Sequence, residues 1–240
     1  AKELDLDDWL GYIEQLEGQD RSSQKNKPVP LTKIDLTISR LRLAQRDFLN
    51  LGVDLRRKDY GWLIQLNNED LQGRIKVPYP DFSNGLLDIS LDRLRVKPVK
   101  DTEEDAEKAD VEISMPPAAE LPEVRVLISN LIYDELALGQ FSFASSKIPQ
   151  GIQVERMNID GSTMTLRSNG SWLTVNGNEK TQLQATFETK DIGTLLAGVG
   201  LEGQIDRGRG QGSMEMNWTG SPVDAQLKSL KGVMEFTLED

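Results

Sequence analysis

The sequence predicts a mainly β protein built as one long antiparallel meander of strands. Apolar and polar residues alternate along many short segments, which places one set of side chains on a single face of each strand. The polar turns between these segments are too short for helical crossovers, so consecutive strands should pair antiparallel. In addition, the segment beginning at Ile34 is echoed ninety positions later at Val124, without gaps as far as Gly61 and Gly151. We therefore expect a repeated sheet with one apolar face.

The expected strands fall into two series, one for each copy of the echo. The first series covers 33–43, 48–56, 61–66, 71–77 and 86–96. The second covers 122–133, 136–145, 150–159, 162–168, 171–176 and 181–189, and strands at 203–206, 212–218, 224–230 and 233–238 complete the chain. Few residues are identical between the copies, but apolar positions agree more often, as in Leu51 with Phe141. Ninety residues is therefore expected to be one structural unit.

Two short helices are expected beside the strands. Residues 7–17 place apolar side chains on one face behind an Asp7 cap, and residues 191–199 do the same behind Asp191. The acids at Asp5, Asp7 and Asp8 could coordinate a hard cation, but acids at the start of a helix also complement its dipole. We favour the helix explanation and expect no metal site.

The chain divides into four expected parts. Residues 1–30 form an N-terminal amphipathic helix and a polar connector, and residues 31–98 form the first β repeat. Residues 99–120 form an acidic, proline-containing loop or linker, and residues 121–240 form the second β repeat with its helix. The charged run within the linker is expected to be solvated, although an acidic docking site is the alternative.

Composition excludes several classes of function. The 240 residues carry a net charge of −11, which disfavours binding to nucleic acid. The chain has neither cysteine nor histidine, so thiolate nucleophiles, Ser-His-Asp triads and histidine-based zinc sites are excluded. The glycine-rich segment from Arg207 to Gly212 lacks the Lys-Ser/Thr ending of a P-loop, and a glycine-rich strand entry explains it better. No motif indicates catalysis, and no cofactor is expected.

No run of about twenty apolar residues and no leader are visible, and the chain begins without methionine, so we expect a piece of a longer protein. The apolar face of the sheet is the remaining functional feature. Two helices of about 17 and 14 Å cannot cover it. Either the sheet closes as a sandwich or barrel, or it curls into an open trough whose apolar floor suits an acyl chain. The candidate floor residues are Ile34, Leu36, Ile38, Leu51, Val53, Ile64, Val124, Val126, Ile128, Phe141, Phe143 and Val154.

Several segments along the chain resemble the AsmA-like superfamily of Gram-negative envelope proteins, and within it the YhdP branch. They are Leu4 to Trp9, Leu71 to Pro78, Asp191 to Leu196 with Gly200, Arg207 to Gly212, Trp218 to Pro222, and Leu230 to Gly232 leading to Glu239 and Asp240. Each segment is a weak mark, but their shared order makes the resemblance specific. The acidic insertion at 100–120 departs from the family pattern.

The resemblance implies a long periplasmic protein that is anchored in the inner membrane and folded as an open β-groove. Such proteins are thought to conduct phospholipid between the inner and outer membranes without a chemical step. The implied partners are phospholipid acyl chains and other envelope proteins, with membrane contact through parts outside this chain. One alternative is a structural or assembly module for outer-membrane biogenesis, with a closed β core that binds protein. A carbohydrate-active protein would need a cleft with two carboxylates about 5 to 10 Å apart.

Overall fold

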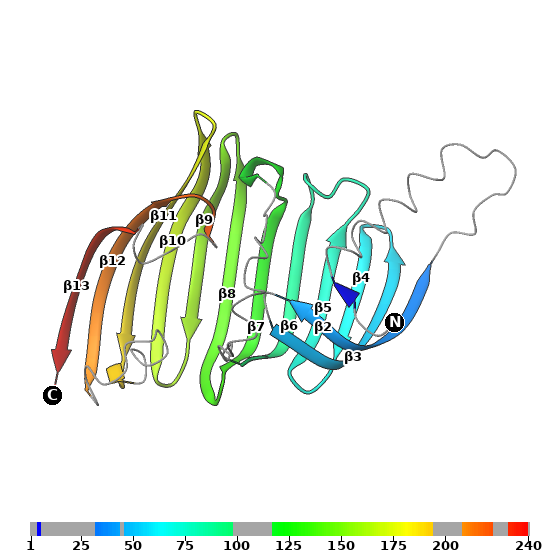
Figure 1. Ribbon diagram of the computed structural model, residues 1–240, viewed down its shortest axis with the longest axis horizontal. Coiled ribbons are helices and arrows are strands. Elements are labelled where there is room, and N and C mark those ends of the chain that lie inside the picture. Colours follow the sequence, from blue (N-terminus) through cyan, green and yellow to red (C-terminus); the bar gives the residue numbers. More distant parts are fainter. Residues whose placement is uncertain are drawn as a thin grey trace, which may run out of the picture.

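The computed structural model describes residues 4–5, 32–43, 46–97, 117–193, 208–222 and 230–239, and the strands among them form one sheet. The strands pair in chain order from β1 to β13, and β4 to β13 cross the long axis of the molecule one after another (Figure 1). The first six are β1 (Leu4–Asp5), β2 (Lys33–Leu43), β3 (Arg46–Lys58), β4 (Gly61–Asn67), β5 (Leu71–Pro78) and β6 (Leu86–Val96). A short 3₁₀ helix, η1 (Ala118–Glu120), precedes β7 (Glu123–Tyr133), β8 (Leu136–Ile148), β9 (Gly151–Asp160), β10 (Met164–Val175), β11 (Asn178–Thr189), β12 (Arg209–Thr219) and β13 (Lys231–Glu239).

The predicted fold class is confirmed: the protein is mainly β, and its single sheet remains open. In the described part of the chain, β13 pairs with β12 alone, at the opposite end of the sheet from β1 and β2. The helix expected at 7–17 lies outside the described residues. Of the helix expected at 191–199, only the start is described, with Ile192 and Gly193 helical. The strand expected at 203–206 and nearly all of that at 224–230 also lie outside the described residues.

The ninety-residue echo reappears in the strand boundaries. β7 begins and ends ninety positions after β2, and β8 begins and ends ninety positions after β3. The next strands start at Gly61 and Gly151, whose φ angles of 136° and 148° are both in the range that favours glycine. A side chain at either glycine would collide with the backbone of a neighbouring strand. Both copies therefore enter their third strand through the same backbone conformation.

Two expected strands prove to be one. The sequence prediction ended one strand at 168 and began the next at 171, but β10 continues through Asn169 and Gly170. The pairing with β9 shifts register between Ser168 and Gly170, which marks a β-bulge. A Cβ atom at Gly170 would meet the carbonyl oxygen of Gln182 on β11, so glycine allows the close approach of the two backbones.

The meander is not antiparallel throughout. β6 and β7 pair parallel, from Leu86 beside Glu123 to Val96 beside Tyr133, and β1 pairs parallel with β2. A parallel pair needs a connection that returns along the full length of a strand. The segment 97–122 between β6 and β7 is long enough for this return, unlike the short turns elsewhere. The sequence prediction of antiparallel pairing was wrong at this junction.

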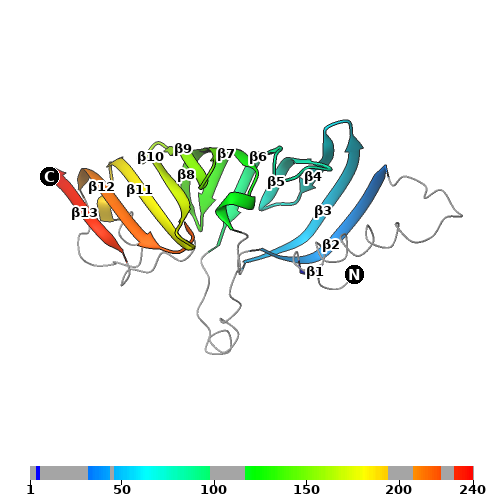
Figure 2. The same ribbon diagram turned by 90° about the horizontal axis from the view of Figure 1, so that it is seen from above.

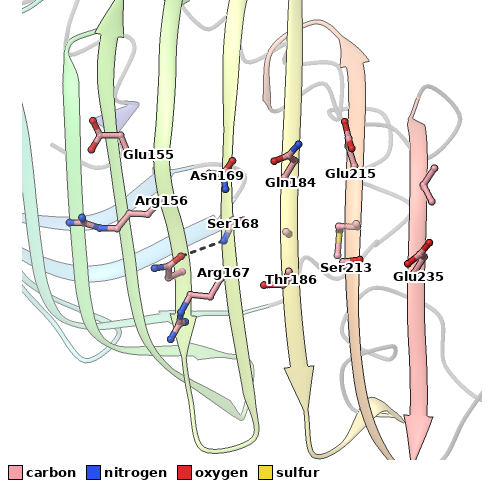
Figure 3. Close-up of a pocket in the computed structure, with 14 residues that line it drawn as sticks. Glu155, Arg156, Arg167, Ser168, Asn169, Gln184, Thr186, Ser213, Glu215 and Glu235 are labelled. Carbon is pink, nitrogen blue, oxygen red and sulfur yellow. Dashed lines mark hydrogen bonds between the residues drawn. The ribbon is translucent and has the colours of Figure 1, made fainter.

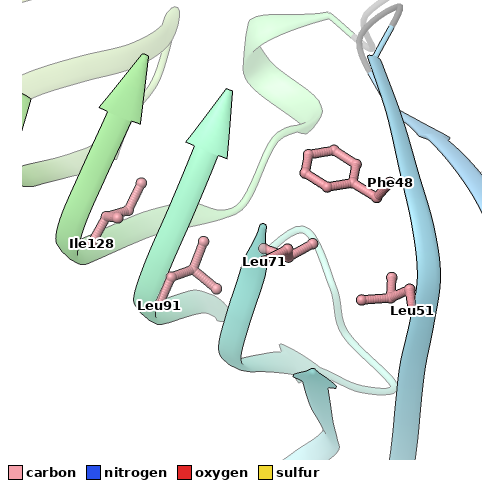
Figure 4. Packing of buried hydrophobic residues seen from close by; sticks show 5 residues of the cluster. All are labelled: Phe48, Leu51, Leu71, Leu91 and Ile128. Atoms are coloured by element: carbon pink, nitrogen blue, oxygen red, sulfur yellow. The ribbon is translucent and has the colours of Figure 1, made fainter. Parts of the chain in front are cut away.

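The far end of the β2–β3 hairpin folds over the apolar face of the sheet. Figure 1 shows this end crossing in front of β5 to β7, and Figure 2 shows it turned beneath the sheet. Phe48 and Leu51 of β3 thereby pack with Leu71, Leu91 and Ile128, which lie on β5, β6 and β7 (Figure 4). On a flat sheet β3 and β7 would be about 19 Å apart, so only a folded hairpin brings them together. This corner is the main buried apolar cluster of the described residues.

Candidate functional site

A continuous row of apolar positions crosses the sheet from β2 to β13. In this row, called the Leu36 row, each residue is the register partner of the next across every strand pair. Its twelve members comprise ten apolar side chains and two glycines. They are Leu36, Val53, Leu66, Gly73, Leu91, Ile128, Phe141, Ile159, Leu166, Phe187, Gly212 and Phe236.

A second row, called the Ile34 row, runs beside it on the same face. Its members are Ile34, Leu55, Ile64, Ile75, Ile89, Val126, Phe143, Met157, Ser168, Ala185, Met214 and Met234. Its one polar member, Ser168, donates its hydroxyl hydrogen to the carbonyl oxygen of Met157 at 2.6 Å, so that polar group is satisfied by the backbone. Eleven steps of about 4.8 Å separate β2 from β13, so each row extends over about 53 Å measured along the sheet.

The row between these two points to the opposite face and is polar. It consists of Asp35, Asp54, Gln65, Arg74, Ser90, Leu127, Ser142, Asn158, Arg167, Thr186, Ser213 and Glu235, with Leu127 as its one apolar member. We call it the Asp35 row. Because apolar and polar rows alternate, the sheet has one apolar face and one polar face from β2 to β13. The apolar side is therefore a strip that runs along the long axis of the molecule.

All twelve predicted floor residues lie on the apolar face, and eight of them belong to the two rows. Leu36, Val53, Ile128 and Phe141 are in the Leu36 row, and Ile34, Ile64, Val126 and Phe143 are in the Ile34 row. The others lie beside these rows: Ile38 pairs with Leu51, Val124 pairs with Leu87 of β6, and Val154 pairs with Ser145 of β8.

The predicted floor residues differ in accessibility. Leu51 is completely buried because it lies on the side of the folded β2–β3 hairpin that faces the sheet, and Ile128, which lies beneath that hairpin, is 5% exposed. The other ten are half-buried. At the other end of the sheet, Met234 and Phe236 of β13 are 57% and 58% exposed. The strip is thus covered over β5 to β7 by the β2–β3 hairpin and is most accessible at β13.

Sequence reasoning missed the floor residues of the last four strands, including Leu166, Phe187, Met214 and Phe236. Their signal was present, because Met214, Met216 and Trp218 alternate with polar residues, as do Met234, Phe236 and Leu238. It also missed Phe48, which is 5% exposed in the buried corner. Phe48 is out of phase with Leu51 in a regular alternation. Asn50 between them has φ 51°, and this left-handed residue turns both side chains to the same side.

The polar face carries a network of ion pairs near β2 and β3. Arg56 donates to Asp54 from Nε at 2.7 Å and from Nη2 at 3.1 Å, while Lys33 lies 2.8 Å from an Asp35 oxygen. The hydrogen bonds from Arg56, aided by Asp35 and by the charge of Lys33, lower the pKa of Asp54 below its usual value. The same pairing raises the pKa of Arg56. These charged side chains lie on the polar face, opposite the apolar strip.

A family model described as YhdP protein matches residues 1–240, the whole chain. The chain belongs to the YhdP family. No curated protein and no solved structure matches it. YhdP membership indicates a lipid-transport-like protein of the bacterial envelope, and the family is not known for an enzymatic activity. A helix able to cross a membrane is not found in the described part of the chain.

Other candidate chemistry is sparse in this YhdP chain. Two hollows on the polar face have volumes of about 670 and 620 Å³, and the second is lined by Glu155, Glu215 and Glu235 beside Arg156 and Arg167 (Figure 3). Among the described residues, no acidic cluster is arranged to hold a metal ion, and Asp7 and Asp8 lie outside them. The glycine-rich segment at 207–212 enters β12 as expected, with Gly212 beneath the ring of Phe187.

Proposed function

We propose that this chain is a segment of a periplasmic groove that conducts phospholipid between the inner and outer membranes without a chemical step. The observation that carries the proposal is the pair of apolar rows that run unbroken from β2 to β13 along one face. Membership in the YhdP family supports it. In this proposal the full-length protein is anchored in the inner membrane through parts outside this chain.

The chemistry of the two rows suits movement along the strip. Burial of one methylene group contributes about 0.8 kcal/mol, so an acyl chain of roughly fifteen carbons gains much from leaving water. These contacts are non-directional, and outside the part covered by the β2–β3 hairpin the rows present accessible apolar side chains on successive strands. An acyl chain can therefore move from the side chains of one strand to those of the next with little change in free energy.

Photo-crosslinking tests which face meets lipid. A photoreactive residue in place of Leu36 or Val126 should capture phospholipid from cells, because both positions are half-buried on the apolar face. The same residue in place of Asp35 or Arg125 should not, because these neighbours are exposed on the polar face. The two residues of each pair are neighbours in the same strand, so the photoreactive residue is introduced at the same place in the sheet and differs only in the face to which it points. Capture is measured by mass spectrometry of the crosslinked lipid.

Position 51 provides a further comparison, because Leu51 has no exposed surface and should capture protein rather than lipid. Equal lipid labelling at Leu36 and Asp35, or labelling at neither, would overturn the proposed function.

The buried corner favours the alternative function over part of the sheet. Phe48, Leu51, Leu71, Leu91 and Ile128 form a dry core of the kind expected for a structural or assembly module. If the whole strip were such a core, a polar residue at Leu36 would unfold the chain. The groove instead predicts a folded chain that has lost lipid capture, which circular dichroism and crosslinking together distinguish.

A further inference from the structure

A cation lies on the apolar face near its border. The guanidinium carbon of Arg57 is 4.2 Å from the centre of the Tyr79 ring and 5.3 Å from that of Trp62. Arg57 pairs with Trp62 across β3 and β4, and Trp62 pairs with Val77 of β5. All these positions continue the alternation of the apolar face. The two rings thus hold the charge of Arg57 at the margin of the apolar strip rather than on the polar face.

The charge of Arg57 is not neutralised by a carboxylate of the described chain. Its neighbour Arg56, on the polar face, hydrogen-bonds Asp54, but no described carboxylate lies within ion-pair distance of Arg57. The lack of a described carboxylate beside Arg57 is unexpected from the composition, because acidic residues outnumber basic residues by 39 to 28 in the chain. Stacking on the two rings leaves the N–H donors at the edge of the guanidinium able to bind an anion.

The second copy of the repeat carries a cation at the equivalent position. Lys147 lies ninety positions after Arg57, near the end of β8 as Arg57 lies near the end of β3. The alternation of β8 places Lys147 on the side of Phe141 and Phe143. Its Nζ donates to the carbonyl oxygen of Ser83 at 3.0 Å, and within the described residues it too has no carboxylate in ion-pair range. Five strand steps, or about 24 Å, separate the two cations along the same border.

We propose that Arg57 and Lys147 bind the phosphate groups of phospholipids whose acyl chains lie on the Leu36 and Ile34 rows. This inference rests on the proposed function and adds headgroup sites to it. A cation at the edge of an apolar strip matches a molecule that joins an anionic phosphate to acyl chains. Arg57 can form two parallel hydrogen bonds to phosphate oxygens, whereas Lys147 offers a point charge. Trp62 and Tyr79 are suited to a boundary between apolar and polar surroundings.

The test compares three ligands by titration calorimetry with the 240-residue chain. They are water-soluble dihexanoyl phosphatidylglycerol, dihexanoylglycerol with the same acyl chains and no phosphate, and inorganic phosphate. We expect the phospholipid to bind more tightly than either of the others. Arg57→Gln and Lys147→Gln should each weaken phospholipid binding about tenfold, the effect of losing a charged hydrogen bond, and leave dihexanoylglycerol binding unchanged. Arg57→Lys should restore part of the loss at position 57.

Arg56→Gln is the matched control, because it removes the adjacent cation from the opposite face. It should leave the affinity for both lipids unchanged, and melting curves of all variants should show a folded chain. Equal preference for phosphatidylglycerol over dihexanoylglycerol in the wild type and both Gln variants would overturn the headgroup sites while the apolar strip stands. Inorganic phosphate bound as tightly as the phospholipid would also overturn them. Failure of the wild type to bind either lipid would instead overturn the proposed function, and these sites with it.

Discussion

Leu49 and Leu51 lie two positions apart on β3 but in opposite environments. Leu51 has no exposed surface, whereas Leu49 is 54% exposed, because the left-handed conformation of Asn50 reverses the facing of the strand between them. Leu51 is also the residue through which the folded hairpin contacts the sheet beneath it. Truncation of the side chain should therefore lower the stability of the protein much more at Leu51 than at Leu49.

Leu51→Ala should lower the free energy of unfolding by about 2 to 5 kcal/mol, because it removes buried methyl groups and leaves a cavity under the hairpin. Leu49→Ala removes the same atoms from an exposed position and should change it by less than about 0.5 kcal/mol. Urea denaturation followed by circular dichroism measures both. A similar loss for the two variants would contradict the packing of the hairpin over β5 to β7.

At the scale of the element, Gly61 and Gly151 fix how β4 and β9 begin. Their φ angles of 136° and 148° strain any other residue, and a Cβ atom would meet the carbonyl oxygen of Val77 in the first case and of Trp172 in the second. Each glycine also follows a two-residue turn, so a change of backbone conformation at the glycine would shift the register of the strand against its neighbour.

Gly61→Ala and Gly151→Ala should each destabilise the protein by more than about 1 kcal/mol. Gly52→Ala is the comparison: this glycine lies within β3 and has no positive φ, and its Cβ would have one near contact, the carbonyl oxygen of Asn67 at 3.3 Å. It should be much less destabilising in the same denaturation measurement. If all three variants unfold at the same urea concentration, the two strand entries are not constrained as the structure indicates.

The elements could be predicted from the sequence where alternation is regular. The bounds of β2 and β6 follow from it directly, and the echo between Ile34 and Val124 locates β7 and β8. The break that was predicted at Asn169 and Gly170 was wrong, because the sequence does not show that this glycine allows a close approach of two strands within β10. The parallel pairing of β6 and β7 depends on the path of a long connection, which alternation does not describe.

The candidate site, too, could be predicted only in part from the sequence. The face of each floor residue was predictable from its phase in the strand. Whether another element covers that residue was not, because Leu51 and Leu36 look alike in sequence and only the fold of the hairpin separates them. Arg57 likewise appears as one cation in a charged turn region until the register places it beside Trp62.

For the whole molecule, the length of the strip matters more than any single contact. The two rows extend over about 53 Å, which exceeds the roughly 15 Å of one acyl layer in a bilayer, so a lipid conducted as proposed would pass many strands in succession. A fixed charge at one strand would then obstruct passage along the entire strip, because an acyl chain would have to displace the water around that charge.

Met214→Glu places a carboxylate in the Ile34 row at β12, and Ser213→Glu places one at the adjacent position on the polar face. With either change in the full-length protein, we expect a folded chain. Transfer of labelled phospholipid between membrane fractions should fall below about a tenth of the wild-type rate for Met214→Glu and stay unchanged for Ser213→Glu. Normal transfer with Met214→Glu would show that lipid does not travel over β12.

The parallel pairing of β6 and β7 determines how the two copies of the repeat are related. Each copy contributes five strands, β2 to β6 and β7 to β11, and an odd number of strands in a pure meander would start the second copy in the reverse direction. Successive copies would then be related by rotation, and equivalent turns would alternate between the two borders of the sheet. The parallel junction between β6 and β7 restores the direction, so the strands of the second copy run the same way as their equivalents in the first. Additional units joined in this way would extend the sheet as a polar filament does, with the same border, and the same cation, on one side throughout.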